Sequence, residues 1–97
     1  MADWVRTTIY YESKKIEDWL KNGKSVDDYI KTLGLSESSP EQIYNKSNYF
    51  YELANSYREQ MNNEWDQNWY ADHPVNESNL LAVGRALDNW YQEIRQK

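Results

Sequence analysis

The 97-residue chain has no cysteine and only one histidine. Without cysteine it can form no disulfide, no thiolate zinc site and no cysteine nucleophile, and we expect a reducing, cytoplasmic environment. It also has no Gly-rich phosphate loop and no nucleophile motif, so the sequence predicts a protein that is not an enzyme and needs no cofactor. No apolar run approaches the roughly 18 residues of a membrane span, and no basic segment followed by an apolar one opens the chain, so we expect neither insertion nor secretion.

One long segment of the chain, between Arg58 and Arg85, contains no lysine or arginine. Residues 1–31 hold six acids and six bases, whereas residues 32–97 hold ten acids and five bases, so the whole net charge of −5 arises in the second part. A surface of this kind repels phosphate backbones and suits a basic protein, and we expect no direct nucleic-acid binding. The segment without bases contains five acids and three large aromatic residues: Glu59, Glu64, Asp66, Asp72, Glu77, Trp65, Trp69 and Tyr70.

The chain is rich in aromatic residues, with five tryptophans and nine tyrosines, and aliphatic residues are few for its length. We therefore expect a core built largely from aromatic rings. A chain of this length is the usual size of one domain, and we expect a single helical domain over residues 1–97. Only two prolines and three glycines are present, which favours long helices.

In the N-terminal third, the apolar spacing and the helix-end residues predict two helices. Apolar residues recur at helical spacing from about Asp3, and Gly23 is well placed to end that helix. The run from Val5 to Tyr11 is rich in β-prone residues and could instead be extended. Ser25 has the character of an N-cap for a short second helix, which Gly34 would stop.

The middle of the chain predicts one long central helix over about residues 40–71. Ser39 and Pro40 give a clear start, and no proline or glycine follows until Pro74. Such a helix would span about 48 Å, more than a compact domain of this size, so we expect a homodimer, a higher oligomer or the target to bury part of it. A turn of 100° per residue places the apolar residues on one inward face: Ile43, Phe50, Leu53, Ala54, Tyr57, Met61 and Trp65.

The C-terminal segment predicts a further helix over about residues 77–95, which Asn76 can cap. Gly84 would allow this helix to approach a neighbour closely. The turn around Pro74 would fold it back antiparallel over the C-terminal half of the long helix, with the two N-terminal helices covering the other half. The expected fold class is therefore all-α, a small helical bundle.

Three residues near the end of the long helix have the spacing of metal ligands. Asp66, Tyr70 and His73 would share one face, and Glu64 or Asp72 could add oxygen ligands. A usual transition-metal site needs more nitrogen or sulfur ligands than one histidine provides. A histidine that interacts with the last carbonyls of a helix is the simpler interpretation, and we expect no metal.

The aromatic residues of the same segment also allow two interpretations. Trp65, Trp69 and Tyr70 beside carboxylates could form a cage for a methylated ammonium or a stacking platform for a base or sugar. The spacing favours instead core packing of Trp65 and Trp69 against the last helix. Tyr70 and Tyr49 point away from the inward face, so they are predicted to be exposed contact residues.

These features predict a non-enzymatic inhibitor, of the type made by phages and mobile elements, whose acidic end blocks a basic, nucleic-acid-handling site on a partner protein. The acids could also form an ordinary solvated surface, since solubility alone favours such a net charge. The long absence of bases favours the inhibitor. The predicted contact residues are Glu59, Glu64, Asp66, Tyr70, Asp72 and Tyr49.

Two other functions stay open. An oligomer could act as a sponge or sensor that holds a nucleotide between Tyr10 or Tyr11 and the N-terminal lysines, although acids are interspersed among those lysines: Lys14, Lys15, Lys21, Lys24 and Lys31. A structural subunit of a larger assembly would instead form a concentration-dependent oligomer with neither ligand nor target.

Overall fold

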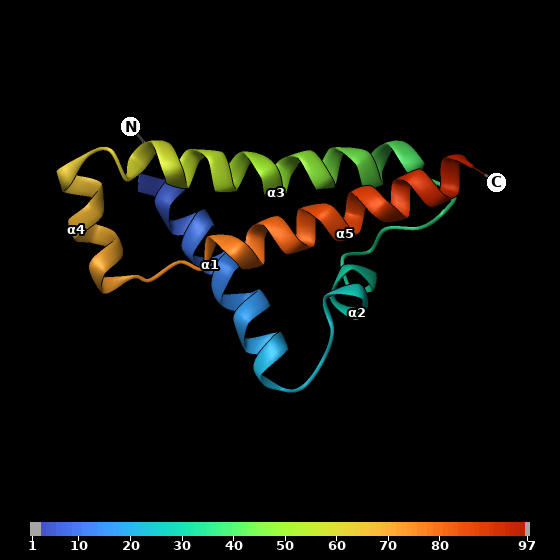
Figure 1. The fold of residues 1–97 in the computed structure, drawn as a ribbon, viewed down its shortest axis with the longest axis horizontal. Helices are drawn as coiled ribbons and strands as arrows, with labels where there is room; N and C mark the ends of the chain where they lie inside the picture. Colours follow the sequence, from blue (N-terminus) through green and yellow to red (C-terminus); the bar gives the residue numbers. More distant parts are fainter. Residues whose placement is uncertain (1–2, 97) are drawn as a thin grey trace.

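The computed structural model describes the backbone of residues 3–96 and the side chains of residues 5–96. This part of the chain forms helices and no strand, so the expected all-α fold class is confirmed (Figure 1). The Cα atoms fill a flat volume of 47 × 29 × 17 Å. The helices are α1 (Asp3–Lys21), α2 (Val26–Lys31), α3 (Pro40–Gln60), α4 (Glu64–Asp72) and α5 (Glu77–Arg95).

The two N-terminal helices follow their sequence signals. The β-prone run lies within α1 and is helical throughout. Gly23 and Gly34 adopt φ values of 77° and 75°, a left-handed conformation that favours glycine after a helix end. The hydroxyl of Ser25 accepts a hydrogen bond from the backbone N–H of Asp28 at 3.1 Å, so the predicted cap of the second helix is confirmed.

The prediction of one helix over residues 40–71 is wrong, because α3 ends at Gln60 and α4 begins at Glu64. The side chain of Asn63 accepts a hydrogen bond from the backbone N–H of Trp65 at 2.8 Å and caps α4. Asparagine is a poor residue inside a helix and a good one at an N-cap, since its side chain competes for backbone groups. The pair Asn62–Asn63 therefore allows a new helix to begin without proline or glycine.

Helices α3 and α5 run antiparallel, side by side along almost their full length (Figure 1). Gly84 makes this close approach possible, since a Cβ atom at that position would lie 3.1 Å from the ring of Tyr51. The buried hydroxyl of Ser47 donates a hydrogen bond to the carbonyl oxygen of Gly84 at 2.8 Å. The predicted role of Gly84 is confirmed.

Ser39 and Asn76 occupy the N-cap positions of α3 and α5, but neither side chain makes a capping hydrogen bond.

The N-terminal helices pack mainly on α5, and not on the N-terminal half of α3 as expected. Helix α1 crosses near the start of α5, where the hydroxyl of Ser13 accepts a hydrogen bond from the backbone N–H of Asn76 at 2.8 Å (Figure 1). Helix α2 packs farther along α5. With both helices on α5, the side of α3 that faces away from α5 stays open to solvent.

The core is more aliphatic than the composition suggests. In the described part of the chain, nine of the thirteen buried apolar residues are Ile, Leu, Val or Ala. Five tyrosines and tryptophans pack around the edge of this cluster, where their polar groups can reach solvent or partners: Trp19, Tyr49, Tyr57, Trp69 and Tyr91. No helix in the described part of the chain is both long enough and apolar enough to cross a membrane. The buried apolar residues are Ile9, Ile16, Tyr29, Ile30, Ile43, Phe50, Leu53, Ala54, Tyr70, Leu80, Val83, Leu87 and Trp90.

We expect Gly84→Leu to reduce the free energy of unfolding by about 1–3 kcal/mol, because the new side chain has to displace the ring of Tyr51 between two packed helices. Urea denaturation followed by circular dichroism measures this change. Gln92→Leu, at an exposed position of the same helix, is the control and should cost less than about 0.5 kcal/mol. Equal stability of the two variants would contradict a tight contact at Gly84.

Candidate functional site

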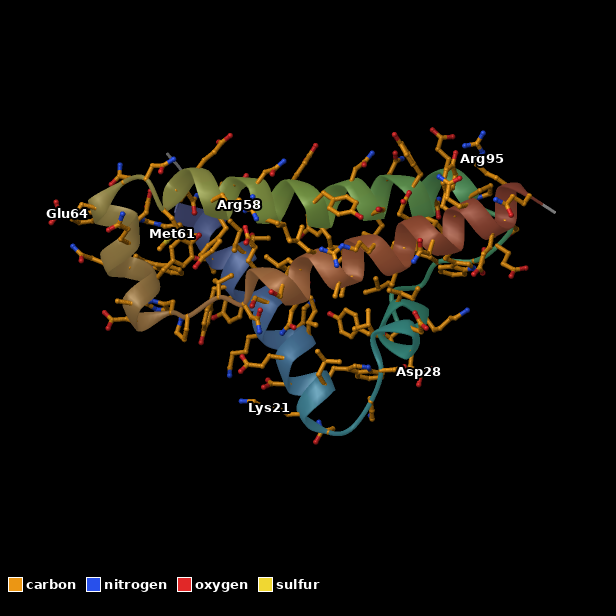
Figure 2. The ribbon with its side chains drawn as sticks, in the orientation of Figure 1. Lys21, Asp28, Arg58, Met61, Glu64 and Arg95 are labelled. Atoms are coloured by element: carbon orange, nitrogen blue, oxygen red, sulfur yellow. The ribbon has the colours of Figure 1, made fainter. Side chains whose placement is uncertain are left out.

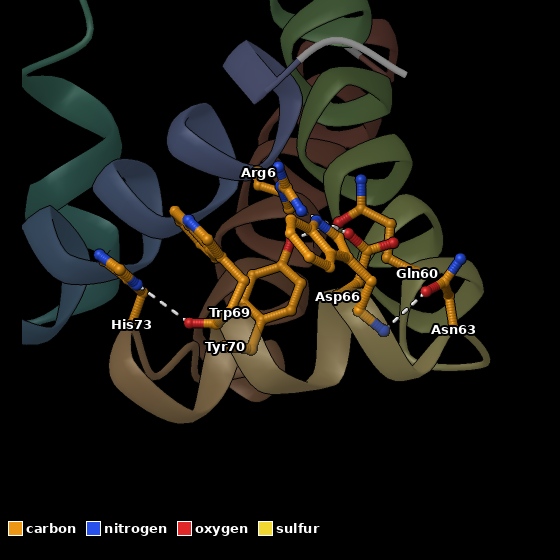
Figure 3. A network of polar contacts seen from close by, with 8 residues as sticks. Arg6, Gln60, Asn63, Asp66, Trp69, Tyr70 and His73 are labelled. Carbon is orange, nitrogen blue, oxygen red and sulfur yellow. Dashed lines mark hydrogen bonds and ion pairs between the residues drawn. The ribbon is translucent and has the colours of Figure 1, made fainter.

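Helix α4 forms one end of the molecule and turns away from the axis of α3 (Figure 1). It is attached by a few polar and aromatic contacts to α1 and to the end of α3 (Figure 3). The side chain of Gln67 helps to fix its start, because its amide donates a hydrogen bond to the carbonyl oxygen of Met61. Glu64 lies at the outer tip (Figure 2).

Tyr70 faces inward, so the prediction of an exposed contact residue is wrong at this position. Its side chain is only 4% exposed, and its hydroxyl donates a hydrogen bond to Oε1 of Gln60. Its ring packs edge-on against those of Tyr57 and Trp69. Burial raises the pKa of Tyr70 above the usual range, and the nearby carboxylate of Asp66 adds to this effect. The break before α4 allows the ring of Tyr70 to fold back on the end of α3, where Gln60 and Tyr57 lie.

Asp66 is paired inside the protein and is not an open acid. Its carboxylate lies 2.8 Å from the guanidinium of Arg6 on α1, and the two side chains are 13% and 8% exposed (Figure 3). The same guanidinium lies 5.4 Å from the ring centre of Trp69. The pair thus cancels one of the five acidic charges in the segment without bases and holds α4 against α1.

Arg6 holds α4 against α1, a role that the charge pattern alone does not reveal. It is buried in line with three other buried residues of α1, which follow it at three, seven and ten residues: Ile9, Ser13 and Ile16. This is the spacing of one helix face. A basic residue on the buried face of a helix needs an acidic partner, and that signal was available in the sequence.

Trp69 packs on the core, as predicted, and the ring contacts of Trp69 and His73 are with each other and with α1. The imidazole of His73 stacks on the indole of Trp69 with ring centres 4.0 Å apart, and Tyr10 meets both rings edge-on. In Figure 3, Trp69 lies between His73 and Arg6. Nδ1 of His73 lies 2.9 Å from the carbonyl oxygen of Trp69, so the simpler interpretation of this histidine, at the last carbonyls of a helix, is confirmed.

The three residues with metal-ligand spacing each have another partner. Asp66 binds Arg6, Tyr70 binds Gln60, and His73 contacts the backbone of Trp69. Within the described residues, no group of three or more His, Asp or Glu side chains could hold a metal ion.

Tyr49 is half-buried and serves a contact between α3 and α1. Its hydroxyl donates a hydrogen bond to the carboxylate of Glu12 at 2.9 Å, and Glu12 is also paired with Lys15 at 3.1 Å. Burial and the bond to Glu12 raise the pKa of Tyr49 to about 12. Its ring edge is partly accessible, but its polar group already has an internal partner.

Three of the predicted acids remain open to solvent. Glu59, Glu64 and Asp72 are exposed, and none of them has an ion pair in the described part of the chain. Glu77, which also lies in the segment without bases, is paired with Arg58. The structure therefore divides the acids of this segment into paired and unpaired ones.

Further exposed acids lie on α3, outside the segment between Arg58 and Arg85 in which the sequence predicted them. Six exposed residues recur there at intervals of four and three, opposite the buried residues of the helix, and every one is a glutamate or an asparagine: Glu41, Asn45, Asn48, Glu52, Asn55 and Glu59. Glu41 and Glu52 were missed because they lie before Arg58. The regular helical spacing of the Glu and Asn residues was the sequence signal for this stripe.

The N-terminal lysines all have partners on their own chain. Lys14, Lys15 and Lys21 form ion pairs with acids on the same helix at 3.8, 3.1 and 3.2 Å, the pattern of an ordinary polar helix face. Lys24 and Lys31 lie over the rings of Trp19 and Trp90. This arrangement gives no support to a nucleotide held by converging lysines.

No protein-family model, no curated protein and no solved structure matches this chain. Its function must therefore come from the chemistry of its own surface. The most distinctive surface combines the exposed stripe of α3 with the exposed acids at the two ends of α4. We call it the acidic surface, and its five carboxylates, unpaired in residues 5–96, are Glu41, Glu52, Glu59, Glu64 and Asp72.

A double-mutant cycle on Arg6 and Asp66 tests how α4 is held. We expect Arg6→Met and Asp66→Asn each to cost about 3 kcal/mol, because each leaves a buried polar group without its partner, and the double variant to cost clearly less than the sum. The exposed pair of Lys21 and Glu17 is the control, with a coupling below about 0.5 kcal/mol. A similarly small coupling for Arg6 and Asp66 would show that the pair does not hold α4.

We expect the protein to lose stability at alkaline pH. A tyrosine whose pKa is raised on folding stabilises the native state fully below its unfolded value of 10, and this contribution is lost as pH rises toward its folded value, about 12 for Tyr49. Denaturation midpoints between pH 9 and pH 12 measure the slope. In Tyr49→Phe the decline should be shallower, whereas Tyr11→Phe, an exposed control, should match the parent. Equal slopes would refute the effect.

Proposed function

We propose that the protein is a non-enzymatic inhibitor that uses its acidic surface to occupy a basic, nucleic-acid-binding site on a partner protein in the cytoplasm. One observation carries the proposal: five exposed carboxylates on α3 and α4 have no ion pair in the described residues. Helix α3 has 21 residues and is about 31 Å long. The acidic surface is therefore long enough to follow a binding channel.

The spacing of the charged groups supports this function. Glu52 and Glu59 are seven residues apart on one face of α3, which places them about 10 Å apart along the helix. The asparagines between the acids add donors and acceptors and no opposing charge. A basic channel that binds phosphates would be attracted to such a row of carboxylates, and the attraction would weaken as salt screens it.

An ordinary solvated helix face looks different, and α1 of the same protein provides the comparison. On α1, the exposed acids Glu17 and Asp18 each have a lysine one turn away. On the stripe of α3 no lysine or arginine takes part, since Arg58 lies to one side and binds Glu77. Solubility alone does not require such a separation of charge.

The test removes charge while keeping side-chain size. We expect Glu59→Gln, Glu64→Gln and Asp72→Asn together to weaken partner binding about tenfold, because three exposed carboxylates each contribute up to about 0.5 kcal/mol. A tagged protein captures partners from lysate at low salt; a captured partner is then purified, and the displacement of a labelled DNA or RNA from it is measured against salt concentration.

The control variant removes three exposed acids that lie elsewhere, Asp18→Asn, Asp27→Asn and Glu93→Gln, and has the same net charge. It should displace the nucleic acid as well as the parent does. The proposal fails if the purified partner binds nucleic acid and the inhibitor at the same time. It also fails if the two triple variants act alike.

A further inference from the structure

Three large apolar side chains of the described residues are exposed, and Trp65 is the most exposed of them. It is 72% exposed, compared with 59% for Tyr11 and 44% for Tyr44. The break between α3 and α4 moves it out of the inward face on which the sequence pattern placed it. Its backbone is fixed, because its N–H is held by the cap of Asn63. An exposed tryptophan on a fixed helix end is a frequent anchor of a protein interface.

The indole belongs to a shallow pocket on the outer side of α4. The pocket has a volume of about 250 Å³ and is lined by Trp65, Asn68, Trp69 and Asp72. Trp65 and Asp72 are seven residues apart and thus lie on the same side of the helix. The ring of Trp69 already contacts His73 and Arg6, so the indole of Trp65 is the aromatic surface that remains for a ligand.

We infer that this pocket binds an arginine side chain of the basic partner, with the guanidinium on the indole of Trp65 and the carboxylate of Asp72 at the other end of the same pocket. The inference rests on the proposed function and names the contact that would anchor it. A planar, weakly hydrated guanidinium stacks on an aromatic face more readily than an ammonium does, and it donates hydrogen bonds in its plane to carboxylate and amide oxygens. Asn68 and Asp72 supply such oxygens along the pocket.

The same helix already holds one arginine in this way. The guanidinium of Arg6 lies 5.4 Å from the ring centre of Trp69 and 2.8 Å from a carboxylate oxygen of Asp66. Trp65 and Asp72 offer the same two groups, an indole and a carboxylate, on the outward side of α4, seven residues apart where Asp66 and Trp69 are three apart. The inward arginine comes from α1, and the outward one would come from the partner.

Charge also decides which occupant fits. A second copy of the protein on this pocket would bring its own Glu64 and Asp72 toward those of the first, and like charges brought together across an interface disfavour association. A basic partner would relieve that repulsion. The carboxylates at both ends of α4 therefore select a cationic side chain over an apolar one.

Two peptides test the inference, nona-arginine and nona-lysine, which carry the same number of basic side chains. We expect the parent protein to bind nona-arginine about fivefold more tightly, since a cation–π contact is worth about 1 kcal/mol. Trp65→Ala should bind both peptides equally, and Trp65→Phe should keep part of the preference. Tyr11→Ala, which removes an exposed ring on another helix, should behave as the parent. Titration calorimetry at low salt measures all four proteins.

The outcomes separate the two proposals. Equal binding of the two peptides to the parent, or a preference that survives in Trp65→Ala, would overturn the arginine site and leave the acidic inhibitor standing. Binding of neither peptide would overturn both. Trp65 lies on the surface, and circular dichroism of Trp65→Ala should match the parent, so a lost preference would report the contact and not the fold.

Discussion

The close packing of α3 against α5 at Gly84 is the constraint on which the rest of the structure depends. A side chain larger than hydrogen at this position would meet the ring of Tyr51, and the hydroxyl of Ser47 bonds the carbonyl of Gly84 itself. The pair forms the long axis of the molecule (Figure 1). Because α1 and α2 both pack mainly on α5, one whole face of α3 remains in water, and that face carries the glutamates and asparagines of the acidic surface.

The packing of α4 against α1 and the end of α3 divides its acidic and aromatic side chains into an inward group and an outward group. Inward from α4 lie Asp66 and Tyr70, whose polar groups are bound by Arg6 and Gln60. Outward lie Glu64, Trp65 and Asp72, which have no such internal partners in the described residues. The inward side of α4 therefore holds the helix in place, and its outward side is available for binding. The proposed contacts with a partner lie on the outward side.

The sequence was sufficient where local chemistry decides the structure. Gly23, Ser25 and Gly34 mark helix ends through backbone conformation and capping, and the helix over residues 77–95 follows from its apolar spacing. The break at residues 61–63 was not predicted, because asparagine weakens a helix only slightly and contacts from a distant segment decide whether the chain turns there. That single error exchanged the environments of Trp65 and Tyr70: the predicted core residue is exposed, and the predicted contact residue is buried.

The flat shape of the molecule has a consequence for any surface that meets α3. The smallest extent of the Cα atoms is 17 Å, and α3 forms one long edge of this plate (Figure 1). Its exposed glutamates lie on the helix face opposite the residues that it buries. The acids therefore stand on a narrow convex rim and not on a broad face. A flat or bulging partner could touch only a few of them at once, whereas a concave channel could receive the whole rim and meet its carboxylates on the floor and both walls.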